Sequence, residues 1–121
     1  MNAVSIPEDR PISPAEAALV SWLLLNAPMG CDTTGRTASV DDLRVVGRCS
    51  CGCPSVDFVA GGQSSGAFPI ASAYGTTADG VVAALIVWER DGVVSGLELC
   101  ELDEPVRSLP LIDTLTMMSP F

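Results

Sequence analysis

The chain has no histidine and no lysine, and each absence excludes a common kind of chemistry. Histidine is the side chain most often used for proton transfer near neutral pH, and it is the commonest metal ligand. Without it, neither a Ser-His nor a Cys-His nucleophilic pair can be assembled. The six basic residues are all arginines scattered singly along the chain, whereas nucleic-acid binding needs clustered positive charge. The sequence therefore predicts no histidine-dependent catalysis and no direct nucleic-acid binding.

Long apolar runs are missing as well. The longest apolar helical segment, residues 15–25, is shorter than the roughly 20 residues that a membrane-spanning helix needs. Near the N-terminus, Glu8 and Asp9 precede Arg10, which is the wrong charge pattern for a secretory signal peptide. We therefore expect no membrane span and a cytoplasmic protein.

The chain is instead rich in apolar residues and in negative charge. Hydrophobic residues make up 48% of the 121 residues and charged residues only 17%, which is typical of a folded domain with one core. Fifteen acidic residues against six arginines give a formal net charge of −9. This excess favours solubility and, alternatively, attraction to a basic partner surface.

The segment SPAE predicts the start of a helix. Ser13 suits the N-cap, Pro14 the first helical position, and Glu16 completes a capping box three residues after the cap. The helix is expected to run to about Asn26, with a wide apolar face that must pack against another layer. The preceding residues 1–12, which include two prolines, are predicted to form a flexible N-terminal arm.

From residue 43 the pattern changes to that of β-strands. The runs rich in β-branched and apolar residues are 43–49, 55–60, 67–74, 81–89 and 93–102. Asp91-Gly92 predicts a hairpin turn, and Pro69 indicates an edge position or a bulge. The sequence thus predicts an α+β domain at 13–112, in which the N-terminal helix packs on an antiparallel meander sheet of about five strands. Residues 113–121 are predicted to be a C-terminal tail.

Three cysteines alternate in the stretch RCSCGCPS: Cys49, Cys51 and Cys53. A zinc ion would need neighbouring sulfurs roughly 4 Å apart. An extended segment of this length would instead span about 13 Å. The three thiolates can therefore meet one ion only if the chain doubles back at Gly52. Cys31 or Cys100 would then be the candidate fourth ligand.

The other interpretation is that these cysteines are small residues in a strand and a tight turn. A disulfide framework is disfavoured because the chain has five cysteines, an odd number, and because we expect a reducing compartment. The C-x-x-C redox motif is absent. We take the strand and turn as the leading interpretation, and zinc binding as the alternative.

Two stretches, VVGRCSCGCPSVDF and DGVVSGLELCELDEPVRSLP, resemble segments of a group of small uncharacterised bacterial proteins. These proteins share an SPAE-like helix start, a cysteine–glycine hairpin and a closing DG…SGLEL strand pair. The resemblance covers about residues 11–110. It implies a coherent domain of bacterial type, and it implies no catalytic residue because no activity is attached to the group.

The leading functional hypothesis is a non-enzymatic protein-binding module, such as an acidic inhibitor or an immunity-type protein that acts on a basic partner. Its positive support is an acidic cluster over the last predicted hairpin and its exit: Glu89, Asp91, Glu98, Glu101, Asp103 and Glu104. Acidic surfaces can capture basic partners quickly, although a solvated hairpin face has the same composition.

Two further functions remain open. The first alternative is a small zinc module that uses the Cys49, Cys51 and Cys53 cluster, and zinc is the only cofactor that we consider. The second is an enzyme with a carboxylate pair drawn from Asp57, Asp79 and Glu89. Nothing in the spacing of these carboxylates favours a pair, so we expect no catalytic residue.

Overall fold

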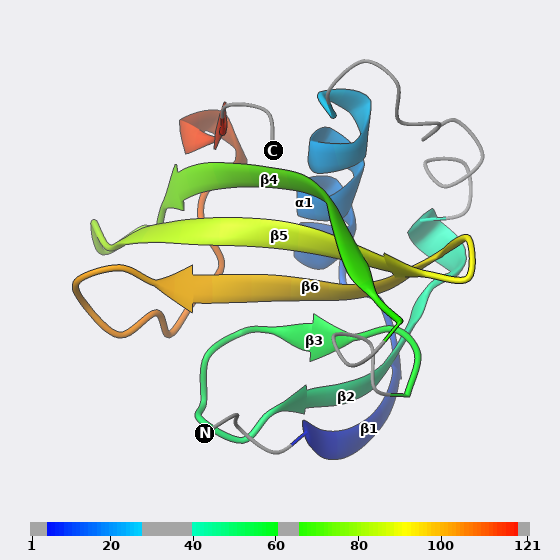
Figure 1. The fold of residues 1–121 in the computed structure, drawn as a ribbon. Coiled ribbons are helices and arrows are strands. Elements are labelled where there is room, and N and C mark those ends of the chain that lie inside the picture. Colours follow the sequence, from blue (N-terminus) through cyan, green and yellow to red (C-terminus); the bar gives the residue numbers. More distant parts are fainter. Residues whose placement is uncertain (1–4, 28–39, 61–65, 119–121) are drawn as a thin grey trace.

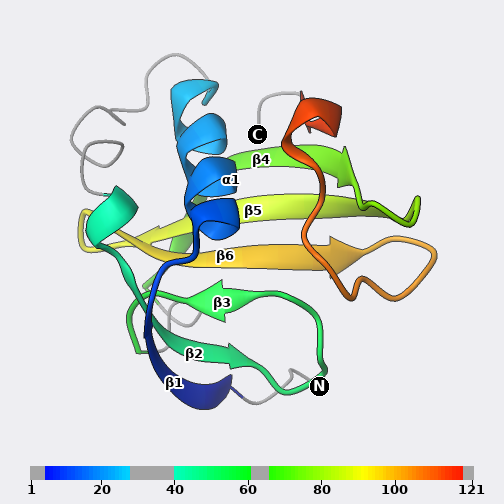
Figure 2. The same ribbon diagram turned by 180° about the vertical axis from the view of Figure 1, so that it is seen from behind.

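The computed structural model describes residues 5–27, 40–60 and 66–118 as one sheet with a helix packed on it (Figure 1). The elements in chain order are β1 (Ser5–Pro11), α1 (Pro14–Leu25), the 3₁₀ turn η1 (Val40–Asp42), β2 (Arg44–Cys49), β3 (Val56–Asp57), β4 (Phe68–Thr76), β5 (Val82–Arg90), β6 (Val93–Glu101), the 3₁₀ turn η2 (Ile112–Thr114) and β7 (Thr116–Met117). The reverse view in Figure 2 shows α1 lying across β4 and β5, on one face of the sheet.

The sheet is antiparallel, and it joins the group β1-β2-β3 to the meander β4-β5-β6, with β7 added at the outer edge of β4. The strand order is β1-β2-β3-β6-β5-β4-β7, so that β3 pairs with β6 instead of with the next strand in sequence. This arrangement confirms the α+β class, with one α-helix on an antiparallel sheet. The strand order also places β6 in the middle of the sheet.

The prediction of about five strands is too low, because the sheet has seven. The two additional strands lie at the edges, in segments that the sequence analysis assigned to the arm and the tail. In place of an arm, Ser5–Pro11 pairs with β2, and two of its residues are prolines that cannot donate to the ladder. At the other edge, Thr116–Met117 pairs with β4. Each edge strand is held by backbone hydrogen bonds to the strand beside it. A local sequence pattern does not reveal such a pairing.

Helix α1 begins as the capping box predicts. The Ser13 hydroxyl accepts a hydrogen bond from the Glu16 backbone N–H at 3.1 Å, and the Ser13 N–H donates to the Glu16 carboxylate at 2.8 Å. The helix ends at Leu25, with Asn26 as its C-cap. Both predicted ends are therefore confirmed.

A chain of four charged side chains ties β2 and β1 to α1, and we call it the Arg–Glu chain. Arg48 Nε lies 3.0 Å from Glu8 Oε1, and Arg10 Nε donates to Glu8 Oε2 at 2.9 Å. Arg10 then donates two parallel hydrogen bonds, of 2.9 and 2.8 Å, to the carboxylate of Glu16. Such a bidentate pair has a well-defined geometry, so it fixes where β1 sits against the start of the helix.

The β5–β6 hairpin provides much of the core. Asp91 and Gly92 have φ angles of 53° and 83°, as the tight turns that favour this dipeptide require. Along β5, Leu85 and Val87 are completely buried, while Ile86 and Trp88 are partly exposed. Among the described residues, no helix has both the length and the apolar character needed to cross a membrane.

Truncating Leu85 tests how much of the stability comes from this core. Leu85 is 0% exposed, so Leu85→Ala should destabilise the protein by about 2–5 kcal/mol in thermal or denaturant unfolding. Val82→Ala is the matched control, because Val82 lies in the same strand and is 47% exposed. Its cost should stay within about 0.5 kcal/mol. Equal effects of the two substitutions would contradict the described core.

The buried Glu16 carboxylate should make stability depend on acid. Burial alone would raise the pKa of Glu16, but hydrogen bonds from Arg10 and Ser13 outweigh it and hold the pKa below its usual value of 4.5. A carboxyl group with a lowered folded-state pKa stabilises the fold above its unfolded pKa, and this contribution disappears as the pH falls through the folded pKa. Glu16→Gln should therefore be less stable at neutral pH and lose less stability on acidification, as measured by denaturant unfolding across the pH range. An acid profile identical to the parent's would exclude this role.

Candidate metal centre

The connection between β2 and β3 is a tight turn that contains the three alternating cysteines. Cys49 is the last residue of β2, and its N–H donates to the Ser55 carbonyl across the turn at 3.3 Å. Within the turn, the Gly52 N–H donates to the Cys49 carbonyl at 3.4 Å. Gly52 has a φ angle of 93°, a conformation that other residues adopt only with strain. The strand and the tight turn of the leading sequence interpretation are present, and its claim that the cysteines only pack there stays a prediction.

The same turn brings the three sulfur atoms together. The Sγ atoms of Cys49, Cys51 and Cys53 all lie within 4.8 Å of one another, and those of Cys49 and Cys51 are 2.8 Å apart. Thiolates around one zinc ion lie roughly 4 Å apart, so small side-chain rotations would accommodate an ion at this group. The reversal at Gly52, which the sequence analysis set as the condition for metal binding, is present. These three sulfurs form a group that could hold a metal ion.

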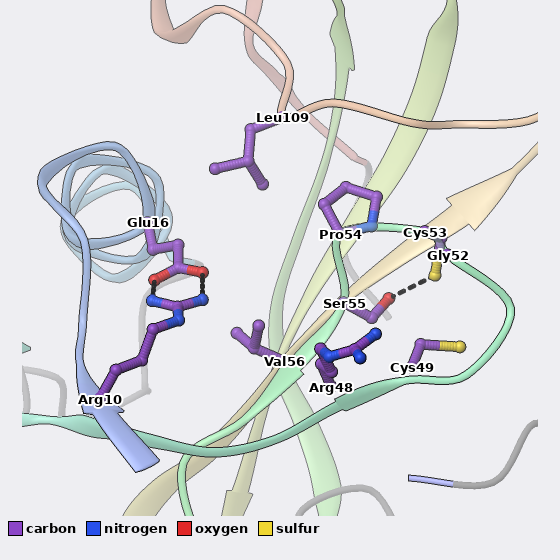
Figure 3. A pocket seen from close by; sticks show the side chains of 10 residues that line it. All are labelled: Arg10, Glu16, Arg48, Cys49, Gly52, Cys53, Pro54, Ser55, Val56 and Leu109. Carbon is purple, nitrogen blue, oxygen red and sulfur yellow. Dashed lines mark hydrogen bonds and ion pairs between the residues drawn. The ribbon is translucent and has the colours of Figure 1, made fainter. Parts of the chain in front are cut away.

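Two contacts attach the cysteine turn to the rest of the protein. Arg107 Nη1, from the segment after β6, donates to the Cys51 carbonyl at 3.0 Å. On the other side, the Cys53 thiol donates to the Ser55 hydroxyl at 3.3 Å, and this hydroxyl accepts from the backbone N–H of Leu99 at 2.8 Å. Figure 3 shows the Cys53 sulfur directed at Ser55. The turn is therefore held from both sides.

The cysteines differ in their readiness to ionise. Burial, together with its hydrogen bond to Cys51, raises the pKa of Cys49 to about 12. Hydrogen bonds from the Cys49 thiol and from the Cys53 backbone N–H instead lower the pKa of Cys51, which is exposed to solvent. Of these two thiols, Cys51 is thus the one that ionises more readily. A bound cation would have to displace the proton of Cys49.

The sequence suggested two candidates for a fourth metal ligand, Cys31 and Cys100. Cys31 lies outside the residues that the structure describes. Cys100 lies opposite Ala84 in the β6–β5 ladder and does not belong to the sulfur group. Burial and the nearby Glu98 carboxylate raise the pKa of Cys100 to about 11. Within the described part of the chain, the sulfur group therefore consists of three ligands.

A hollow of about 220 Å³ adjoins the cysteine turn on the side of α1 (Figure 3). Its walls include Arg10 and Glu16 from the Arg–Glu chain, and also Arg48, Val56 and Leu109. Arg10 is fully engaged by Glu8 and Glu16, so its charge is already compensated. The hollow thus provides space beside Cys49 and Cys53. Because the charge of Arg10 is compensated, Arg10 places no unpaired positive charge in this space.

The acidic residues predicted to bind a partner include one buried side chain, and the others are spread from the turn before β6, along β6, to its exit. Glu89 is only 6% exposed, because it follows Leu85 and Val87 on the alternating buried side of β5. Asp91 lies in the turn before β6, whereas Glu101 ends that nine-residue strand. At about 3.3 Å per residue, roughly 25 Å separates these two ends.

The remaining members of the acidic cluster lie near the end of β6. Glu98 accepts a hydrogen bond from the Trp88 indole N–H at 3.0 Å, and it is only partly exposed. Glu101, Asp103 and Glu104 are exposed and close in sequence. Capture of a basic partner by these three residues stays a prediction. The alternation of Leu85, Val87 and Glu89 was the feature that could have identified Glu89 as buried.

The carboxylates considered for an enzyme also occupy separate positions. Asp79 lies in the turn before β5 and accepts a hydrogen bond from the Thr77 hydroxyl, while Glu89 is near the other end of that strand. Asp57, in β3, accepts from the Ser5 hydroxyl at 3.0 Å. The length of β5 therefore separates Asp79 from Glu89.

Comparison of the chain with protein-family models, with curated proteins and with solved structures gives no match. The resemblance to a group of small bacterial proteins stays a prediction. Among the described residues, the sulfur group offers the most specific chemistry.

Proposed function

We propose that this protein is a small metal-binding module that holds one Zn²⁺ ion through Cys49, Cys51 and Cys53. The observation that carries the proposal is the convergence of three sulfurs, within 4.8 Å of one another, on a single turn. Thiolates are soft ligands that select zinc over the harder ions magnesium and calcium. A site made of thiolates alone also fits a chain without histidine.

Packing alone explains the position of these cysteines poorly. Structural cysteines without chemistry are usually buried among apolar residues. Here Cys51 is exposed, and Cys49 and Cys53 are only partly buried. Three partly or fully exposed thiols that face one another gain little from hydrophobic burial, whereas a cation between them would gain three charged ligands.

The surroundings of the turn suit a bound cation and its excess thiolate charge. Three thiolates around Zn²⁺ carry a net charge of −1, and Arg48 and Arg107 lie beside the turn. Zinc prefers four ligands, and a site with three protein ligands leaves one position open. That position would be filled by Cys31 or by a solvent molecule. The choice between them decides whether the site is closed or accessible.

Zinc titration of the reduced, full-length protein tests this function. We expect one ion per chain. Cys51→Ser and Cys53→Ser should each weaken binding by more than about 100-fold, because each removes one of the three thiolates. Cys100→Ser is the matched control, because it removes a thiol outside the sulfur group and should leave the affinity unchanged.

Cobalt substitution gives an independent measurement of the ligands. A Co²⁺ complex of the parent protein should show thiolate-to-cobalt charge-transfer absorption, which decreases in Cys51→Ser and Cys53→Ser. Cys31→Ser separates a closed from an open site, because the tetrahedral cobalt spectrum changes only if Cys31 is the fourth ligand. If five thiols remain freely titratable after zinc is added, and no charge-transfer band forms, the proposed function is wrong.

A further inference from the structure

Within the sulfur group, Cys49 and Cys51 are much closer to each other than metal coordination requires. Their Sγ atoms are 2.8 Å apart, and the two residues are separated only by Ser50. We propose that, in the metal-free protein, Cys49 and Cys51 are a thiol–disulfide exchange pair whose substrates are small, accessible disulfides. This activity does not depend on the proposed metal binding, although both use the same sulfurs and so exclude each other.

The geometry allows a bond between these two sulfurs. A disulfide has an S–S distance of about 2.05 Å, so Cys49 and Cys51 need to approach by less than about 1 Å, which a small rotation of either side chain provides. A disulfide with one intervening residue closes a small ring and is strained. Strained disulfides are easily reduced, and they are typical of catalytic or regulatory pairs rather than of structural ones.

Different exposures assign different roles to the two thiols. Cys51 is exposed, so it can reach the sulfur of an incoming disulfide, whereas Cys49 is partly buried behind it. The Cys53 backbone N–H donates to the Cys51 sulfur at 3.4 Å and supports negative charge there. The Cys53 thiol donates a hydrogen bond to the Ser55 hydroxyl. Cys51 is therefore the attacking sulfur, and Cys49 the resolving one.

The reaction proceeds in two steps. The Cys51 thiolate attacks one sulfur of the substrate disulfide, whose S–S bond breaks, and the leaving thiolate takes a proton from solvent. Cys49 then loses its proton to solvent and attacks the Cys51 sulfur, which releases the second substrate thiol. In total, two cysteine thiols are oxidised by two electrons to one disulfide, and the substrate disulfide is reduced to two thiols.

This chemistry was missed in the sequence because only the C-x-x-C spacing was considered. In an extended strand, the side chains of residues 49 and 51 lie on the same face but far apart along the chain. The strand ends at Cys49, and the turn that follows draws the two sulfurs together. The close contact therefore depends on the turn.

Oxidised glutathione, a small disulfide, is the probe for this activity. The full-length protein with Cys31→Ser and Cys100→Ser is freed of metal and treated with a large excess of the probe under anaerobic conditions, because a strained disulfide forms only when excess oxidant drives the exchange. The products are followed by mass spectrometry. We expect each chain to lose two hydrogens, to release two molecules of glutathione, and to yield a peptide with Cys49 joined to Cys51. In the same background, Cys49→Ser should accumulate a mixed disulfide between Cys51 and glutathione. Its fraction should exceed that of the parent by at least about tenfold, because intramolecular resolution is lost.

Cys51→Ser in this background should form neither the internal disulfide nor the early mixed disulfide. The proposal is overturned if the parent accumulates the mixed disulfide as stably as Cys49→Ser does, if the disulfide joins Cys53 instead, or if no exchange occurs. Zinc titration of the reduced parent protein, which keeps Cys31 as the candidate fourth ligand, distinguishes this failure from failure of the proposed function. Zinc binding without disulfide formation refutes only the exchange pair, and disulfide formation without zinc binding refutes only the metal module.

Discussion

The pairing of β3 with β6 is the contact on which the cysteine turn depends. It consists of only two residue pairs, Val56 with Leu97 and Asp57 with Gly96. The Ser55 hydroxyl extends this short ladder, since it accepts from the Leu99 N–H at 2.8 Å and lies 3.4 Å from the carbonyl of the same residue. The buried Ser55 side chain thus takes the place of a further backbone hydrogen-bonded pair. Its hydroxyl also accepts a hydrogen bond from the Cys53 thiol. The position of the sulfurs is thus set by the centre of the sheet.

This attachment matters for chemistry because it organises the thiols before any ligand arrives. Ordering a flexible five-residue segment would cost about 1–2 kcal/mol per residue. In this protein the segment is already ordered by its link to β3, by Ser55 and by the hydrogen bond from Arg107 to the Cys51 carbonyl. Binding of a ligand therefore does not have to supply this free energy. On the other side, the Arg–Glu chain runs from Arg48, next to Cys49, to Glu16 in α1. A metal ion or a disulfide would therefore meet sulfurs that are already close together.

Short-range patterns were predictable from the sequence, and long-range pairings were not. The capping box at Ser13 and the turn at Asp91 need only neighbouring residues, and both formed as predicted. Edge strands β1 and β7 depend on hydrogen bonds from distant segments, so their own sequences resembled an arm and a tail. The pairing of β3 with β6 likewise joins residues about 40 positions apart, and such contacts leave little local trace.

The candidate site was predictable only in part, for the same reason. Glycine adopts a positive φ easily, so the local sequence indicated that the chain could reverse at Gly52. This reversal was the stated condition for the three cysteine sulfurs to come together. The Cys53 thiol is held by Ser55, whose long-range contact with Leu99 no local pattern reveals. The burial of Glu89 did have a local indication, because alternation along β5 places it on the same side as Val87.

The central claim is that three sulfurs of one turn bind a single ion. X-ray absorption at the zinc edge, recorded on the full-length protein with one equivalent of Zn²⁺, measures those ligands directly. The account predicts a first shell with at least three sulfurs at about 2.3 Å and one further ligand. A first shell made of oxygen or nitrogen, with at most one sulfur, would contradict it.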